Sequence, residues 1–192
     1  MAATSPLRHR GIAPPCQAVR APRRRQLLPG VRCVRYALDK EATVTQEEVL
    51  VLLDKTLPKG PGGTVVLATC DGHRPRARAM GLVRDGFHFY FGTARCTGKG
   101  RDIAACPEIE IVALLPLDKG IGQLRVAGRA VEVKGKPLRE AWARAGGYDV
   151  TFYMKGGLDD PEFAAFRIDV EKALLMPPGT MNEEELPLAW FK

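Results

Sequence analysis

The feature of the sequence that most constrains its fold is a run of short segments with a hydrophobic period of two. Between residues 64 and 133, segments rich in Val, Ile and aromatic residues alternate apolar and polar positions, and Asp-Gly pairs at 71–72 and 85–86 separate the first three. This alternation is typical of strands with one buried face, and Asp-Gly favours tight hairpin turns. Because such strands bury their apolar faces by pairing with neighbours, the sequence predicts an antiparallel sheet.

Six strands and a few helices account for most of the chain after residue 44. The expected strands are 64–69, 76–83, 87–93, 108–115, 123–133 and 166–175, with a bulge at Gly128. A capping box from Thr45 to Glu48 starts an amphipathic helix, and further helices are expected over 97–105 and 137–145. The pattern predicts a mostly β fold with a few helices, a small antiparallel barrel.

The formal net charge of +7 is concentrated at the N-terminus. Residues 1–38 hold eight arginines and no acidic residue, so the rest of the chain has 21 basic against 22 acidic residues. A nucleic-acid-binding domain carries its basic residues on the folded surface, so we expect no nucleic-acid partner. Residues 1–38 contain no apolar run long enough to span a bilayer, and we expect no membrane partner.

We predict that residues 1–38 form a disordered, arginine-rich leader, followed by a folded domain at 45–176 and a C-terminal tail at 177–192. The leader is either an organellar transit peptide, which is typically rich in Arg and poor in acids, or an upstream extension. The first alternative places the protein inside a chloroplast or mitochondrion, and the second in the cytoplasm. The three cysteines beyond the leader, Cys70, Cys96 and Cys106, lack paired spacing and are expected to be free thiols.

A candidate anion site combines Arg76, Arg78, Thr93, Thr97 and Lys99. The predicted topology places these side chains on adjacent strands and at the start of a short helix. A phosphate is bound well by a guanidinium fork, a lysine, hydroxyl donors and the free amides of a helix N-terminus. The alternative is an exposed charged strand beside a glycine-rich loop.

Two other groups of residues each admit two interpretations. Cys70 and His73 flank an Asp-Gly pair, which fits either a nucleophile or metal site or an ordinary hairpin turn, and we expect the turn and no metal. Tyr148, Phe152 and Tyr153 either cover a flat ligand or anchor a loop. No catalytic residue is identified.

The order of the motifs resembles that of the pyridoxamine 5′-phosphate oxidase-like family. The resemblance runs through "PRARAMG", "DGFHFYFGT", "TGKGRDIAACPEIEIV" and "GQLRVAGRAVEV", and the family line of a Thr followed six residues later by a Lys matches Thr93 and Lys99. Members of this family are flavin-binding split barrels. The resemblance therefore implies a six-stranded antiparallel split barrel that binds FMN, with a deazaflavin or haem as alternative cofactors.

The resemblance also implies roles for individual positions. Arg78 or Arg76, together with Lys99, resembles the ligands of the FMN phosphate, and Thr97 resembles a phosphate-binding hydroxyl. The other positions that the resemblance places beside the flavin are Ala79, Met80, Thr93 and Gln123. A homodimer and a small-molecule substrate are implied in the same way.

The end of the chain departs from the family pattern. True pyridoxamine phosphate oxidases carry a Trp followed by an Arg-Leu-Pro segment that helps bind the substrate, whereas this chain ends in "ELPLAWFK" with no arginine after Trp190. We therefore do not expect vitamin B6 oxidation. Two functions remain: an FMN-dependent oxidoreductase acting on a small molecule, and a non-enzymatic module that holds flavin or haem.

Overall fold

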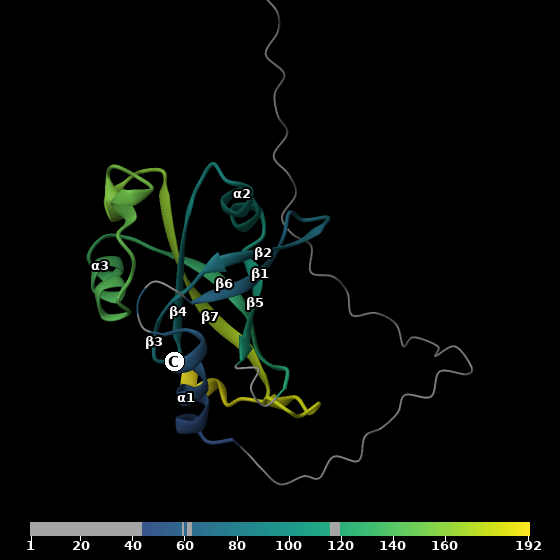
Figure 1. Ribbon diagram of the computed structural model, residues 1–192. Helices are drawn as coiled ribbons and strands as arrows, with labels where there is room; N and C mark the ends of the chain where they lie inside the picture. The colour runs from purple at the N-terminus through teal and green to yellow at the C-terminus, as the bar shows by residue number, and fades with distance from the viewer. Residues whose placement is uncertain (1–43, 59, 61–62, 116–119) are drawn as a thin grey trace, which may run out of the picture. The chain divides into compact units, whose positions relative to one another are not determined.

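A computed structural model describes residues 44–58, 60, 63–115 and 120–192 (Figure 1). The predicted leader, with Cys16 and Cys33, lies outside the described residues. In the part that is described, no helix is long and apolar enough to cross a membrane.

Helix α1 (Gln46–Thr56) begins at the predicted capping box. The amide of Glu48 donates to the Thr45 hydroxyl at 3.3 Å, and the Glu48 carboxylate accepts from the Thr45 amide at 2.8 Å. Two of the amides that a helix start leaves without partners are therefore satisfied. Val49 and Leu53 then fall on one face of the helix and are fully buried.

The strands are β1 (Thr64–Cys70), β2 (Pro75–Gly81), β3 (Val83–Asp85), β4 (His88–Ala94), β5 (Glu108–Leu115), β6 (Gly122–Val133), β7 (Phe163–Met176) and β8 (Glu184–Glu185). They form one sheet in the order β2-β1-β5-β6-β7-β4-β3, with β8 paired to β7, and every pairing is antiparallel. The sheet curls into the half-barrel of a split barrel, which confirms the predicted fold (Figure 1).

The described chain has eight strands where six were predicted, because one expected strand is divided and β8 is added. The division falls at Leu82. Gly81 pairs with Thr64 in β1, whereas Val83 pairs with Tyr90 in β4. Since β2 and β3 are the two ends of the strand order, one residue joins opposite edges of the sheet, and the sheet must curl to bring those edges together. The sequence pattern continues through Leu82 and does not show this change of partner.

The structure confirms the predicted bulge at Gly128, where the register between β6 and β7 shifts. Ala127 pairs with Lys172 and Gly128 pairs with Val170, so the extra residue, Glu171, lies on β7 and not on β6. A Cβ atom on Gly128 would lie 2.1 Å from the carbonyl oxygen of Asp169. Glycine is therefore required by the close approach of the two backbones.

Two helices complete the fold near the site. Helix α2 (Gly98–Ala105) follows β4, and α3 (Gly135–Arg144) follows β6. Beside α3, Leu138 and Trp142 pack with Tyr90 and Phe163 in a second apolar cluster, separate from the main core between the sheet and α1. Trp142 is thus a core residue, and it lies four residues after the buried Leu138 on one face of α3.

The predicted C-terminal tail contributes to the core. After β8, the 3₁₀ turn η4 (Leu188–Phe191) brings the ring of Phe191 to 5.2 Å from that of Phe87 and 6.3 Å from that of Phe89. Leu186 and Phe191 are both buried. Residues 184–191 therefore belong to the packed domain.

Candidate ligand-binding site

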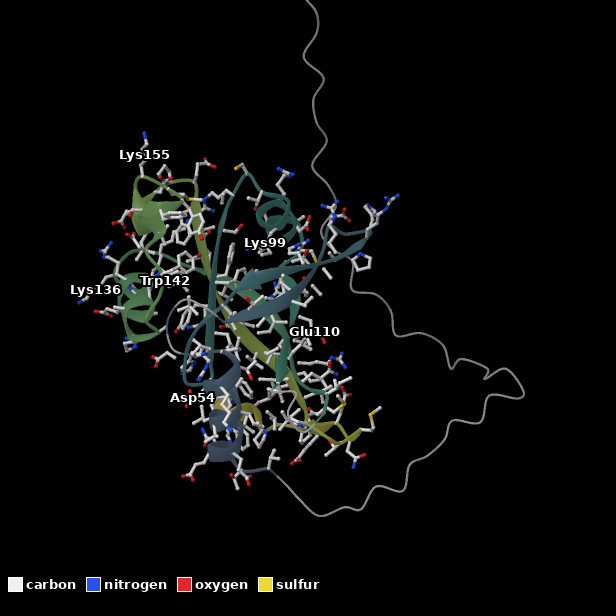
Figure 2. The ribbon with its side chains drawn as sticks, viewed as in Figure 1. Asp54, Lys99, Glu110, Lys136, Trp142 and Lys155 are labelled. Carbon is white, nitrogen blue, oxygen red and sulfur yellow. The ribbon has the colours of Figure 1, made fainter. Side chains whose placement is uncertain are left out.

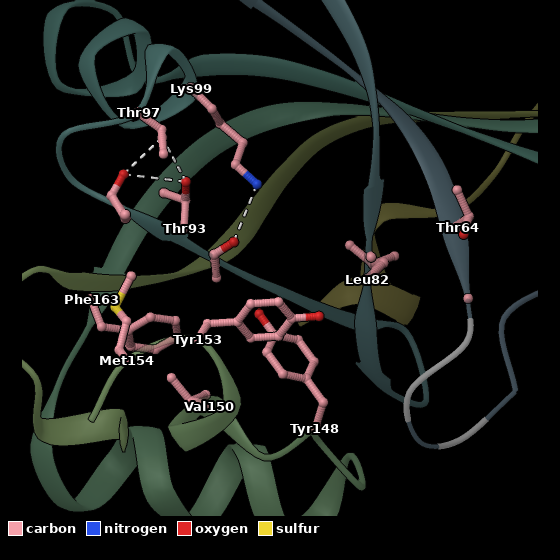
Figure 3. Close-up of a pocket in the computed structure, with 14 residues that line it drawn as sticks. Thr64, Leu82, Thr93, Thr97, Lys99, Tyr148, Val150, Tyr153, Met154 and Phe163 are labelled. Carbon is pink, nitrogen blue, oxygen red and sulfur yellow. Dashed lines mark hydrogen bonds between the residues drawn. The ribbon is translucent and has the colours of Figure 1, made fainter. Parts of the chain in front are cut away.

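A cavity of about 580 Å³ opens between the start of β1, the ends of β2 and β4, the start of α2 and the segment that joins α3 to β7 (Figure 3). Its volume is in the range of sites for small organic ligands and cofactors. Thr93, Thr97 and Lys99 line one side, and Tyr148, Tyr153, Met154 and Phe163 are among the residues that line the other.

Lys99 supplies the positive charge of the cavity. Its ammonium donates to the carbonyl oxygen of Gly92 at 3.2 Å and lies 5.8 Å from the centroid of the Phe91 ring. Within the described ranges no carboxylate lies at ion-pair distance from it. Burial, together with the nearby charge of Arg78, lowers the Lys99 pKa to about 8. A half-buried ammonium without a counter-ion favours an anionic ligand.

Two threonines and the start of α2 lie beside Lys99. Thr97 is the N-cap of α2, where its hydroxyl accepts from the Gly100 amide at 3.1 Å. The hydroxyls of Thr93 and Thr97 are hydrogen-bonded to each other at 2.9 Å (Figure 3). The first amides of α2 have no partner within the helix, so this side of the cavity combines a cation, hydroxyls and a helix N-terminus.

Arg76 and Arg78 are held by Asp102, which sequence analysis missed. The Asp102 carboxylate is only 2% exposed and accepts from Arg76 at 3.1 Å, from Arg78 at 3.0 Å and from the Thr69 hydroxyl at 2.9 Å. Neither arginine is among the residues that line the cavity. Both remain near it: a Cβ atom on Gly98, at the start of α2, would lie 4.0 Å from Arg76 Nη1, and the charge of Arg78 acts on Lys99. Asp102 is the only acidic residue of α2, and this single acidic residue is the sequence feature that could have pointed to it as a partner of the arginines.

The remaining predicted residues divide between the two faces of the sheet. Met80 is buried on the inner face, with its sulfur 3.8 Å from the Lys99 ammonium. Ala79 and Gln123 lie on the outer face, because Ala79 pairs with the half-exposed Val66 and Gln123 pairs with the exposed Leu114. The structure thus brings Thr93, Thr97, Lys99 and Met80 together and separates Ala79 and Gln123 from the cavity.

The tyrosines at 148 and 153 form an aromatic wall. The Tyr148 ring meets the Trp142 ring edge-on at 5.1 Å and the Tyr153 ring at 5.9 Å. Phe152 and Tyr153 are 84% and 72% exposed, an unusual state for large aromatic side chains. Of the two interpretations of this segment, Tyr148 fits both: its backbone carbonyl accepts from Trp142 Nε1 at 2.9 Å, and its ring lines the cavity.

The segment from Cys70 to His73 forms the turn that its Asp-Gly pair predicts. The Asp71 carboxylate accepts from the amides of His73 at 3.0 Å and Arg74 at 2.8 Å. Across the described residues there is no group of three or more His, Cys, Asp or Glu side chains placed to hold a metal ion. The thiol of Cys106 donates to the Glu108 carboxylate at 3.2 Å.

Comparison with protein families gives a match between residues 62–176 and the family model described as pyridoxamine 5′-phosphate oxidase. The chain belongs to the pyridoxamine 5′-phosphate oxidase family. The matched range contains every strand of the sheet except β8, as well as both sides of the cavity. No protein with a curated function matches the sequence.

Solved structures share the fold at low sequence identity. A haem-binding protein from Mycobacterium smegmatis superimposes with a TM-score of 0.59 at 17% identity over 74% of this chain, which spans 59% of that protein. A Clostridium acetobutylicum protein related to general stress protein 26, of the pyridoxine phosphate oxidase family, gives 0.55 at 16% identity over 77% of this chain and 96% of its own. The haem storage protein HutZ from Vibrio cholerae gives 0.53 at 16% identity, over 70% and 94%.

Proposed function

We propose that this protein binds FMN in the cavity and uses it as an oxidoreductase acting on a small molecule. The observation that carries the proposal is the Lys99 ammonium, which lies half-buried beside the N-terminus of α2 without a carboxylate partner in the described chain. An ammonium in this environment is costly unless an anion joins it. Membership of the pyridoxamine 5′-phosphate oxidase family makes a flavin phosphate the anion that we infer.

The residues present fit such a cofactor. Lys99, the Thr97 hydroxyl and the first amides of α2 would hold the phosphate, with Arg76 next to them. The aromatic and apolar side chains opposite, including Tyr148 and Phe163, would contact the isoalloxazine ring. When bound, the flavin supplies the electron or hydride transfer, and the chain binds it, orients it and excludes water.

Haem binding without turnover is the second candidate. Two of the structural neighbours are a haem-binding and a haem storage protein, and both share this fold. Tyrosine is a known axial ligand of haem iron, and Tyr148 and Tyr153 both line the cavity. The two functions differ in a simple way: an enzyme turns over its flavin with a reductant, whereas a module does not.

We further propose that two copies of the chain meet through the outer face of β2, β1, β5 and β6. This face carries the small residues Ala77 and Ala79 and the exposed apolar residues Val66 and Leu114. Its charges are neutralised within the chain, because Arg125 pairs with Glu110 at 2.7 Å and Arg129 pairs with Glu108. Two copies can therefore approach without like-charge repulsion.

The test is a titration of the full-length protein with FMN, followed by visible absorption. We expect near one-to-one binding and a loss of affinity in Lys99→Met, of about 10- to 150-fold if one charged hydrogen bond is removed. Lys136→Met is the control, because Lys136 projects from α3 into solvent with its side chain 81% exposed (Figure 2).

The same preparation separates the candidate functions. Bleaching of the bound flavin by NADH or NADPH, with reoxidation in air, supports the oxidoreductase. A protein that ignores FMN but gives a haem absorption band with hemin supports the module and contradicts the flavin proposal.

A further inference from the structure

Tyr148 lines the cavity and packs against the core beneath α3. Its ring packs against the Trp142 ring, and its backbone carbonyl accepts from Trp142 Nε1 at 2.9 Å. The preceding residue, Gly147, permits this arrangement, because a Cβ atom there would lie 2.2 Å from Trp142 Nε1. The Tyr148 ring therefore lies against the packed core beneath α3.

The hydroxyl of Tyr148 reaches the backbone of β4 inside the cavity. A Cβ atom on Gly92 would lie 2.8 Å from the Tyr148 hydroxyl oxygen, and the carbonyl of the same Gly92 accepts from Lys99. The two donors reach Gly92 from different elements, the charged Lys99 from α2 and the neutral Tyr148 from the segment that joins α3 to β7 (Figure 3). Among the residues described, this hydroxyl has no hydrogen-bond partner.

The protonation of Tyr148 and the chemistry of its neighbours limit what it binds. Burial and the neighbouring Tyr153 raise the Tyr148 pKa, so the group remains a hydrogen-bond donor at neutral pH. Around it lie Val150, Met154 and Phe163, which are all apolar. The apolar and aromatic lining at this end favours an apolar ring system with an acceptor atom within reach of one hydroxyl.

We propose that Tyr148 donates a hydrogen bond to the ring system of the bound flavin, while the rings of Tyr148 and Tyr153 form the wall against which that ring system lies. Tyr148 is then a binding residue for the ring, and Lys99 is a binding residue for the phosphate. This inference rests on the proposed function and deepens it, because it divides the cavity into two ends that recognise different parts of one ligand.

The experiment compares FMN with riboflavin, which has the same ring system and no phosphate, on the full-length protein. Tyr148→Phe keeps the ring and removes the hydroxyl. We expect this variant to bind FMN and riboflavin more weakly by the same factor, about three- to tenfold for the loss of one neutral hydrogen bond. Lys99→Met should instead weaken the binding of FMN alone, because riboflavin has no phosphate for Lys99 to bind. Tyr90→Phe is the matched control: Tyr90 lies in the same apolar cluster but outside the lining of the cavity, and neither affinity should change.

The outcomes separate the inference from the proposed function. If Tyr148→Phe binds both flavins as tightly as the wild type, the hydroxyl does not contact the ligand and the inference is wrong, while the proposed function stands. If it weakens FMN alone, Tyr148 acts at the phosphate end and the division of the cavity is wrong. If the wild type binds neither flavin, the proposed function fails and the placement of Tyr148 fails with it.

Discussion

At the scale of single residues, the ammonium of Lys99 links the cavity to pH. Its pKa, lowered to about 8 by burial, implies that it carries a charge below that pH and loses it above. A phosphate monoester is fully ionised at these pH values, since its second pKa is about 6. We therefore expect FMN affinity to fall as the pH rises through about 8. Titrations between about pH 7 and 9.5 check this, and a profile that is equally steep in Lys99→Met would contradict it.

The same group affects the stability of the ligand-free protein. The Lys99 pKa of about 8 in the folded protein lies below the ordinary lysine pKa of 10.5, which applies to the unfolded chain. Between these two pH values the unfolded chain therefore binds more protons than the folded one. Stability from this group is then present above 10.5 and is lost as the pH falls through about 8. Lys99→Met should therefore exceed the wild type in free energy of unfolding at pH 7, with the difference shrinking toward pH 10.5. Urea denaturation across that range measures it, and a constant difference would contradict the prediction.

Asp102 gives a prediction that does not depend on a ligand. It accepts from three donors while fully buried, so Asp102→Asn removes the charge from the contacts to Arg76 and Arg78. Because both arginines are partly exposed, we expect a loss of about 2 kcal/mol in the free energy of unfolding. Asp159→Asn, in an exposed pair with Arg139, should cost less than about 0.5 kcal/mol. Equal costs in urea denaturation would show that the network adds no stability.

The sequence was enough to predict several residues that line the cavity, but not which side chains they contact. The spacing of Thr93, Thr97 and Lys99 follows from one strand, one turn and one helix, so local patterns were enough to place them together. Asp102 was missed because its partners come from β1 and β2, up to 33 residues away. Which face of the sheet Ala79 and Gln123 occupy also depends on pairing with distant strands, which periodicity alone does not specify.

At the scale of secondary structure elements, local signals located the strands and helices, and non-local pairing determined how they end. The capping box, the Asp-Gly turns and the period of two correctly predicted α1 and the strands through β7. The break at Leu82 was not predicted, because it arises where the curled sheet brings its two edges together. The bulge is similar: Gly128 marks its place, but the register with β7 decides that Glu171 is the extra residue.

The requirement for glycine at the bulge can be tested by adding a single methyl group. Gly128→Ala places a Cβ atom 2.1 Å from the Asp169 carbonyl oxygen, so the β6 and β7 backbones must separate. We expect a cost of about 1–3 kcal/mol in the free energy of unfolding, the usual range for overpacking. Gly81→Ala is the matched control, because a Cβ atom at that strand position meets nothing within 4 Å. If both substitutions changed the unfolding midpoint in urea equally, close approach would not be the reason for Gly128.

At the scale of the whole molecule, the outer face of the sheet gives the last prediction. Val66 lies in the middle of that face, paired with Ala79 on one side and Val112 on the other, and is 39% exposed. If a second copy covers this face, a carboxylate there is buried against apolar residues without a partner, which costs several kcal/mol and dissociates the dimer.

Sedimentation of the full-length protein should therefore give twice the mass of one chain for the wild type and the mass of one chain for Val66→Asp. Val51→Asp is the control, since Val51 is 53% exposed on α1, outside this face, and its replacement should leave the dimer intact. A wild type that stays monomeric at all concentrations, or a Val66→Asp variant that stays dimeric, would show that this face is not the contact. Because Gln123 lies on the same face, loss of the dimer together with loss of FMN affinity would also indicate that the second copy completes the site, and so explain why Gln123 lies outside the cavity of one chain.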